Sequence, residues 1–192
     1  IHKLDWFPVY EIPTLALDLT SLKSVRGFSA EDLSFDNEFD LYDYDSQKDQ
    51  LGLINTYRSK SYLKWRYARN PINQYQNMVV GDGNKILSFA VFKIYTINKK
   101  KYLDLVDFGP YDNDAFGFLL ENLISYALKM DCVGIKTWAP RHHDSHYVLS
   151  KRGFKHELPI TYFTVKTLNS SLTSRLKCFS NWWIMMGDSD IY

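Results

Sequence analysis

Residues 102–139 decide the fold, and they read YLDLVDFGPYDNDAFGFLLENLISYALKMDCVGIKTWA. Side chains alternate over 102–108, and 132–139 is a short apolar run typical of a buried strand. Between them, apolar residues recur over 114–130 at the i, i+3/i+4, i+7 spacing of a helix. Strand, helix and strand form a βαβ unit, whose two strands run parallel. We therefore expect these strands to be neighbours that splay apart at their C-terminal ends, with the helix packed on the sheet.

A hairpin precedes this unit. Residues 75–80 and 86–97 have β-rich composition, and the turn sequence GDGN separates them. A second turn, NKKK, leads to the first strand of the unit, so the sequence predicts three consecutive antiparallel strands. In the third strand, alternation places Asp107 on the face of Leu105 and Asp104 on the opposite face.

The remaining elements are predicted from shorter signals. Residues 59–71 read as a helix that Ser59 caps and Pro71 stops. Further expected elements are a strand at 22–28, a helix-like stretch at 29–44, a strand at 160–167 and a short strand at WWIMM, 182–186. Residues 1–21 are punctuated by proline and read as a linker or edge segment, which leaves 22–192 as the domain. Because the chain opens on Ile1, we expect further sequence before it, and another lobe is one candidate.

Composition excludes several classes of protein. The 192 residues carry 23 Lys+Arg and 22 Asp+Glu, so the formal charge of +1 argues against a nucleic-acid binder. No apolar run approaches the ~18 residues that a membrane span needs, and no signal peptide is visible. Cys132 and Cys178 are far apart, which fits a reducing cytoplasm. We expect a cytoplasmic protein without a membrane span.

The segment HHDSHYVLSKRGF, residues 142–154, offers two interpretations. His142 and His143 both have a zinc-like spacing to His146, but no second cluster supplies the remaining ligands. The alternative is a helix that Asp144 or Ser145 caps, with Gly153 in the left-handed position after its end and Phe154 packed back on it. This second interpretation explains more residues, so the sequence predicts a helix and no metal.

The order of these elements resembles the GNAT acyltransferase fold, a mixed and mostly antiparallel sheet flanked by helices (α/β, or α+β). The resemblance covers roughly residues 22–192. Two longer motifs, SYLKWRYARNP and NWWIMMGDSD, resemble a bacterial GNAT subgroup associated with surface-polysaccharide biosynthesis. Members of that subgroup can carry two GNAT-like lobes.

The resemblance implies a site for acetyl-CoA in the V between the two parallel strands. The pyrophosphate would lie on the N-terminus of the helix that follows, where free N–H groups attract an anion. The cofactor-binding residues would then be Phe108, Gly109, Asn113, Ala115, Phe116 and Gly117. The sequence departs from the family's Gln/Arg-x-x-Gly-x-Gly/Ala loop at Tyr111, Asp114 and Phe116. Asp112 and Asp114 are expected to oppose the pyrophosphate.

The catalytic residues also depart from the family pattern. Leu149 stands where many GNAT enzymes place the tyrosine that protonates the CoA thiolate, and Tyr147 lies on another side of the helix. His146 could replace it, since an unperturbed pKa of ~6.5 suits acid/base chemistry. Asp107 or Asp104 is the candidate base for the substrate amine.

Two functions therefore stay open. The first is an N-acetyltransferase that moves an acetyl group from acetyl-CoA to an amine, with an amino sugar as one candidate acceptor. The second is a degenerate GNAT-like lobe that acts as an interaction or sugar-binding module. The lack of a basic patch argues against an aminoacyl-tRNA donor. A homodimer or a second GNAT-like lobe is the expected protein partner, and GDSD (187–190) is either an ammonium-binding pair or a polar turn.

Overall fold

The computed structural model describes residues 6–22, 33–44, 53–83, 85–110 and 112–189. Within these ranges one seven-stranded sheet runs in the order β2-β3-β4-β5-β6-β1-β7. The strands are β1 (Phe7–Asp18), β2 (Leu33–Phe35), β3 (Gln76–Asp82), β4 (Lys85–Ile97), β5 (Lys100–Pro110), β6 (Cys132–Trp138) and β7 (Lys155–Val165). Only β5 and β6 pair in parallel among these strands. The mixed, mostly antiparallel sheet with a βαβ unit confirms the predicted fold class.

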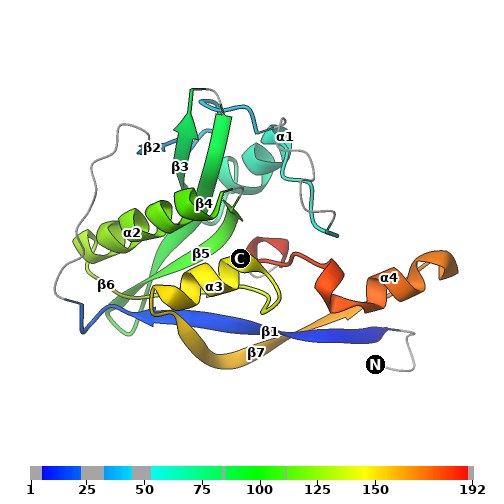
Figure 1. The fold of residues 1–192 in the computed structure, drawn as a ribbon. Helices are drawn as coiled ribbons and strands as arrows, with labels where there is room; N and C mark the ends of the chain where they lie inside the picture. Colours follow the sequence, from blue (N-terminus) through cyan, green and yellow to red (C-terminus); the bar gives the residue numbers. More distant parts are fainter. Residues whose placement is uncertain (1–5, 23–32, 45–52, 84, 111, 190–192) are drawn as a thin grey trace.

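Helices cover both faces of this sheet (Figure 1). One face carries α2 (Asn113–Lys129) and α3 (Asp144–Lys151), and the other carries α1 (Lys60–Leu63), which continues into a π-helix, η2 (Lys64–Ala68). The C-terminal part holds η3 (Ser170–Leu172), α4 (Thr173–Lys177), η4 (Phe179–Asn181) and η5 (Met186–Asp188). None of the helices in the described ranges is long and apolar enough to cross a membrane.

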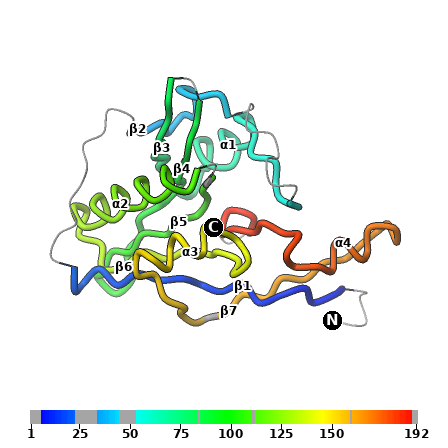
Figure 2. Tube along the Cα trace, viewed as in Figure 1, coloured from blue at the N-terminus to red at the C-terminus, as the bar shows by residue number. Residues whose placement is uncertain are grey.

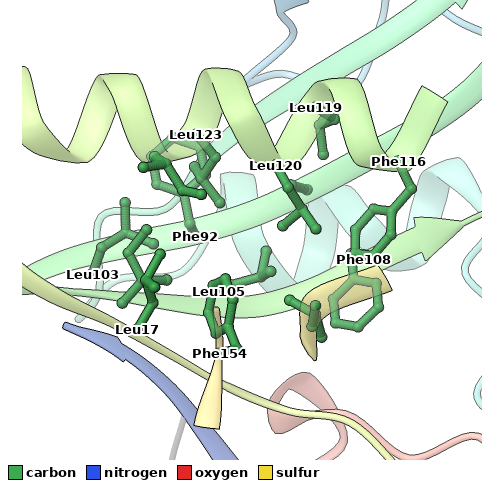
Figure 3. Packing of buried hydrophobic residues seen from close by; sticks show 14 of the residues in the cluster. Leu17, Phe92, Leu103, Leu105, Phe108, Phe116, Leu119, Leu120, Leu123 and Phe154 are labelled. Carbon is green, nitrogen blue, oxygen red and sulfur yellow. The ribbon is translucent and has the colours of Figure 1, made fainter. Parts of the chain in front are cut away.

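The larger core lies between the sheet and α2. Leu119, Leu120 and Leu123 are fully buried and point from α2 towards the strands (Figure 3). Phe108 and Phe116 stack at the start of the helix, with ring centroids 4.9 Å apart. The predicted apolar stripe of this helix is therefore the surface that fixes it on the sheet.

The βαβ prediction is confirmed in detail. The parallel pairing of β5 and β6 runs from Lys101↔Cys132 to Leu105↔Thr137 and stops there, although β5 continues to Pro110. The strands thus diverge at their C-terminal ends and form a fork. The hairpin of β3 and β4 and the antiparallel pairing of β4 with β5 are confirmed as well.

A β-bulge in β5 corrects the predicted faces of that strand. Val91 pairs with Asp107 and Phe92 pairs with Leu105, so Val106 is an extra residue without an opposite partner. The extra residue turns Asp107 away from the face of Leu105. The prediction that these two side chains share a face is wrong.

The N-terminal prediction is also wrong in part. Residues 7–18 form β1, which lies between β6 and β7 and pairs with both, so they are neither a linker nor an edge. Ile12, Leu15 and Leu17 are buried, and the prolines lie where the register with β7 shifts. A domain that begins at residue 22 would therefore leave out β1, which is part of the sheet.

Four other predicted elements have different outcomes. Residues 33–44 contain the short β2 and turns in place of the helix, and the predicted strand at 22–28 lies outside the described residues, apart from Leu22. WWIMM is no strand: it makes one isolated parallel bridge, Ile54↔Trp182, before η5. The helix after Ser59 is confirmed, with the Ser59 hydroxyl accepting from the Tyr62 N–H at 3.2 Å.

The predicted helix at 142–154 is confirmed, with a different cap. His143 is the N-cap, because its ring nitrogen accepts from the Ser145 N–H. At the other end, the Phe154 N–H donates to the Leu149 carbonyl and Gly153 has a φ of 90°. This left-handed glycine explains why the helix ends in Gly-Phe.

Candidate functional site

The fork between β5 and β6 is filled by the C-terminal segment of the chain itself. Trp183 and Met185 belong to the core on the α2 side, whereas Ile184 and Met186 belong to the core on the opposite side. All four are buried. A segment whose successive side chains enter opposite cores passes between them, and Figure 2 shows it beside the ends of β5 and α3. We call residues 182–188 the fork segment.

The backbone of β5 is engaged by the fork segment. The Phe108 N–H lies 3.3 Å from the Met185 Sδ and 3.0 Å from Oδ1 of Asp107, so its hydrogen-bonding capacity is used within the protein. Gly109 is buried and pairs with Phe89 of β4. Of the predicted cofactor-binding residues, these two therefore lie against protein atoms at the fork.

The other predicted cofactor-binding residues lie at the start of α2. Asn113 is exposed there, while Phe116 is buried under Phe108. The helix is capped by Asp112, whose carboxylate accepts from the Ala115 N–H at 2.8 Å. The N-cap Asp112 thus lies one residue before Asn113 and two before Asp114.

Gly117 lies one turn further along α2, where its carbonyl accepts from the Arg152 Nε at 3.1 Å. The guanidinium of Arg152 also contacts the Glu121 carboxylate at 3.1 Å. Of the six predicted cofactor-binding residues, Phe108 and Gly109 thus lie in the packed fork. The other four lie in the first turns of α2, where the Asp112 carboxylate already accepts one N–H.

Asp107 is the centre of a buried ion-pair network. Arg58 places its Nε 2.7 and 2.9 Å from the two carboxylate oxygens, and the Tyr67 hydroxyl donates to the same group at 2.8 Å. Asp188 contacts Nη2 of the same guanidinium at 3.0 Å. Asp107 is fully buried, which raises its pKa, and Arg58 opposes that rise. The same two carboxylates raise the pKa of Arg58 against the effect of its burial. We call Arg58, Asp107 and Asp188 the clasp.

The clasp holds the fork segment in place. The Met185 N–H donates to Asp188 at 2.9 Å, and the Arg66 Nε donates to the Gly187 carbonyl at 3.3 Å. A Cβ at Gly187 would clash with the Tyr67 hydroxyl and would lie 3.2 Å from Oδ2 of Asp107, so the close approach favours glycine. The motifs SYLKWRYARNP and NWWIMMGDSD therefore meet in space, and the GDSD carboxylate at 188 binds an arginine of the protein. Asp190 lies outside the described residues.

Asp104 lies on the sheet face opposite α2, next to the last residues that pair β5 with β6. It is 4% exposed, and the Tyr95 hydroxyl donates to it at 3.1 Å. Burial raises the pKa of Asp104 to about 6, although Tyr95, Lys93 and Lys136 act in the opposite direction. A carboxyl group with this pKa can accept a proton near neutral pH.

The histidines of 142–146 are separated by the fold. His143 stacks on Trp183, with centroids 5.1 Å apart, and burial lowers the pKa of His143 to about 4. His142 contacts the Trp182 carbonyl at 3.0 Å, and His146 faces His156 on β7 at 5.3 Å. Among the described residues, no three His, Cys, Asp or Glu side chains are placed to hold a metal ion.

The two positions on α3 considered for the acid, Leu149 and His146, lie in different surroundings. Leu149 is fully buried in the core under α3. His146 is half-buried, and burial lowers its pKa, with His156 and Arg141 adding to the effect. The imidazole at the fork is that of His143. Sequence reasoning gave Arg58 no role and did not place His143 or residues 182–188 at the fork, because their partners there lie far away along the chain.

Comparisons with known proteins identify the fold. No protein-family model matches the sequence, and a search of curated proteins finds no relative. Solved structures do match: a GCN5-related N-acetyltransferase from Anabaena variabilis aligns at a TM-score of 0.60 and 11% identity, over 85% of this chain and 42% of that one. A probable N-acyltransferase from Enterococcus faecalis aligns at 0.58 and 10% identity, over 85% of this chain and 41% of that one.

A more distant enzyme aligns as well. The N-myristoyltransferase of Saccharomyces cerevisiae, solved with bound myristoyl-CoA, gives a TM-score of 0.51 at 12% identity, over 86% of this chain and 54% of that one. This chain thus spans about two fifths of the Anabaena and Enterococcus proteins. At these identities the likeness concerns the fold, and the chain has the fold of the GNAT acyltransferases.

Proposed function

We propose that this chain is a GNAT-like lobe that does not hold acyl-CoA in its own fork and serves an acyltransferase as a positioning or acceptor-binding lobe. The observation that carries the proposal is the hydrogen bond from the Phe108 N–H to Met185, inside a fork that Trp183 and Met185 fill. Acyl-CoA bound there would have to displace these two side chains from the core. Each of them is a large apolar group whose burial stabilises the fold by roughly 1.5–3 kcal/mol.

The helix that would receive the pyrophosphate supports the same function. Asp112 occupies the Ala115 N–H, and Asp114 adds a second exposed carboxylate on the first turn. A helix N-terminus stabilises an anion by only ~0.3–2 kcal/mol, whereas two charges ~4 Å apart can repel by up to ~4 kcal/mol near a protein surface. Repulsion therefore outweighs the attraction.

In this proposal, a second GNAT-like lobe of the same protein or of a partner holds the acyl-CoA. The acceptor would be an amine, and an amino sugar of surface-polysaccharide biosynthesis is the candidate that the two motifs suggest.

Calorimetric titration with acetyl-CoA tests the proposal. We expect no saturable heat for the wild type or for Asp114→Gly, which removes the second carboxylate. Amide hydrogen exchange provides a positive measurement: the Phe108 N–H should exchange slowly without any ligand, because Met185 and Asp107 accept it. Tight binding of acetyl-CoA to the wild type, with protection of 108–117, would refute the proposal.

The second candidate is an N-acetyltransferase that acts with its own fork, and the position of Asp104 favours it. This carboxyl lies next to Leu105↔Thr137, the last β5–β6 pair before the fork, and could accept the proton of an amine nucleophile. Release of CoA from acetyl-CoA in the presence of glucosamine measures this activity. If the candidate is right, Asp104→Asn abolishes the release and the exposed control Asp131→Asn does not.

A further inference from the structure

A pocket opens where β7 bends away from β1. Ile12 pairs with Thr161 and Thr14 pairs with Glu157, so β1 has one residue between these pairs while β7 has three. The single residue on β1 is Pro13, which has no N–H to donate, and a proline stands among the three on β7 as well. The interrupted ladder leaves a cavity of about 560 Å³, the β1–β7 pocket. This volume lies within the roughly 300–1,000 Å³ of small-molecule sites.

Apolar side chains supply much of the wall. Leu158 and Tyr162 of β7 are 75% and 69% exposed, and Ile160 lies between them in the sequence. Pro8, Val9 and Pro13 line the pocket from β1. Exposed apolar groups in a concave site are suited to the ring or chain of a ligand.

Two charged side chains of the pocket wall do not form an ion pair with each other. Arg141 and Glu11 line the pocket, and neither side chain has an ion-pair or hydrogen-bond partner among the described residues. Glu157, in contrast, is neutralised by Lys136 at 2.7 Å. His156 brings an imidazole to the same wall, next to His146.

Arg141 and His156 both lie near His146 of α3, on one side of the pocket. Burial lowers the pKa of His146, and His156 and Arg141 lower it further because they disfavour another positive charge nearby. A guanidinium without a partner can bind a carboxylate or phosphate through two parallel hydrogen bonds. Glu11 is then the group that can accept a hydroxyl or ammonium of the same ligand.

We propose that the β1–β7 pocket binds a small organic anion, with Arg141 and His156 holding a carboxylate or phosphate and Leu158, Ile160 and Tyr162 packing on an apolar ring or chain. This site lies apart from the fork and does not depend on the function proposed above.

Titrations followed by amide chemical shifts in two-dimensional NMR test the site. The probes are phenyl phosphate, benzoate and benzyl alcohol, which share one ring and differ in the anionic group. We expect saturable shifts at 8–13 and 156–162 with at least one anion, and at least tenfold weaker binding of benzyl alcohol. The tighter anion identifies the site as one for a phosphate ester or for a carboxylate.

Arg141→Gln should weaken binding of the anion about tenfold or more, because a charge-assisted hydrogen bond is lost. Arg69→Gln, which removes another exposed arginine on the far side of the sheet, should leave binding unchanged. The proposal is overturned if neither anion shifts these amides, if benzyl alcohol binds as well as the anions, or if Arg141→Gln binds like the wild type. The wild-type titrations decide the matter alone should Arg141→Gln fold poorly.

Discussion

Replacing Arg58 with methionine should remove a large part of the free energy of unfolding of this chain. The substitution removes the guanidinium between two carboxylates, of which Asp107 is fully buried and Asp188 is 10% exposed. A charge pair ~4 Å apart in an effective dielectric of ~20 is worth about 4 kcal/mol. Loss of one partner from a buried pair costs about 3–5 kcal/mol, since a charge stays buried without compensation. We expect the free energy of unfolding to fall by that amount near neutral pH.

The cost should depend on pH in a defined direction. Burial already raises the pKa of Asp107, and without Arg58 nothing comparable opposes the rise. A carboxyl whose folded-state pKa exceeds its unfolded value stabilises the fold fully below the unfolded value and loses this contribution as pH rises through the folded value. The loss of unfolding free energy caused by Arg58→Met should therefore increase between about pH 5 and about pH 7. The increase is up to ~1.4 kcal/mol per pH unit for each proton that the folded variant keeps and the unfolded chain releases.

Urea denaturation followed by circular dichroism measures both quantities. Lys60→Met is the matched control, because Lys60 and Asp40 form an exposed ion pair at 3.1 Å, and its loss should cost less than about 1 kcal/mol. An Arg58→Met deficit as small as the control's, or one that does not change with pH, would refute the reasoning.

Three further features can each be tested by substitution. Asp112→Ala should cost about 1 kcal/mol of unfolding free energy through the lost N-cap, whereas Asp114→Ala should cost far less, as urea denaturation will show. Gly153→Ala should lower stability by roughly 1–2 kcal/mol in the same assay, because φ at this position is 90°. Asp104→Asn should gain stability relative to the wild type as pH rises from about 4 to about 7, by roughly 1–3 kcal/mol. The reason is that the raised pKa of Asp104 makes its ionisation costly in the folded state. Thermal melts at each pH measure the difference between the two proteins, and a difference that stays constant with pH would contradict this prediction.

Local patterns predicted the part of the fold that local contacts build. The helix 114–130 and its flanking strands follow from spacing alone, because the apolar stripe is contiguous in sequence. The end of α3 was equally predictable, since only glycine fits readily at the left-handed position of Gly153.

The rest depends on residues that meet across long separations. Arg58 binds Asp107 and Asp188, and no local signal announces such partners. The bulge at Val106 inverts the face of Asp107, although the sequence alternates without interruption. WWIMM has strand-like composition, yet its side chains are buried in two different cores. In each case tertiary packing overrides local propensity.

The position of β1 has a consequence for biosynthesis. Thr14 pairs with Trp138 and Leu15 pairs with His156, so the strand that the ribosome makes before all other described strands is hydrogen-bonded only to strands made much later. Such topologies have high contact order and fold slowly. Until β6 and β7 emerge, Leu15 and Leu17 remain exposed on an unpaired strand, a state that invites aggregation and chaperone binding. Nascent chains halted before residue 155 should therefore be the aggregation-prone species.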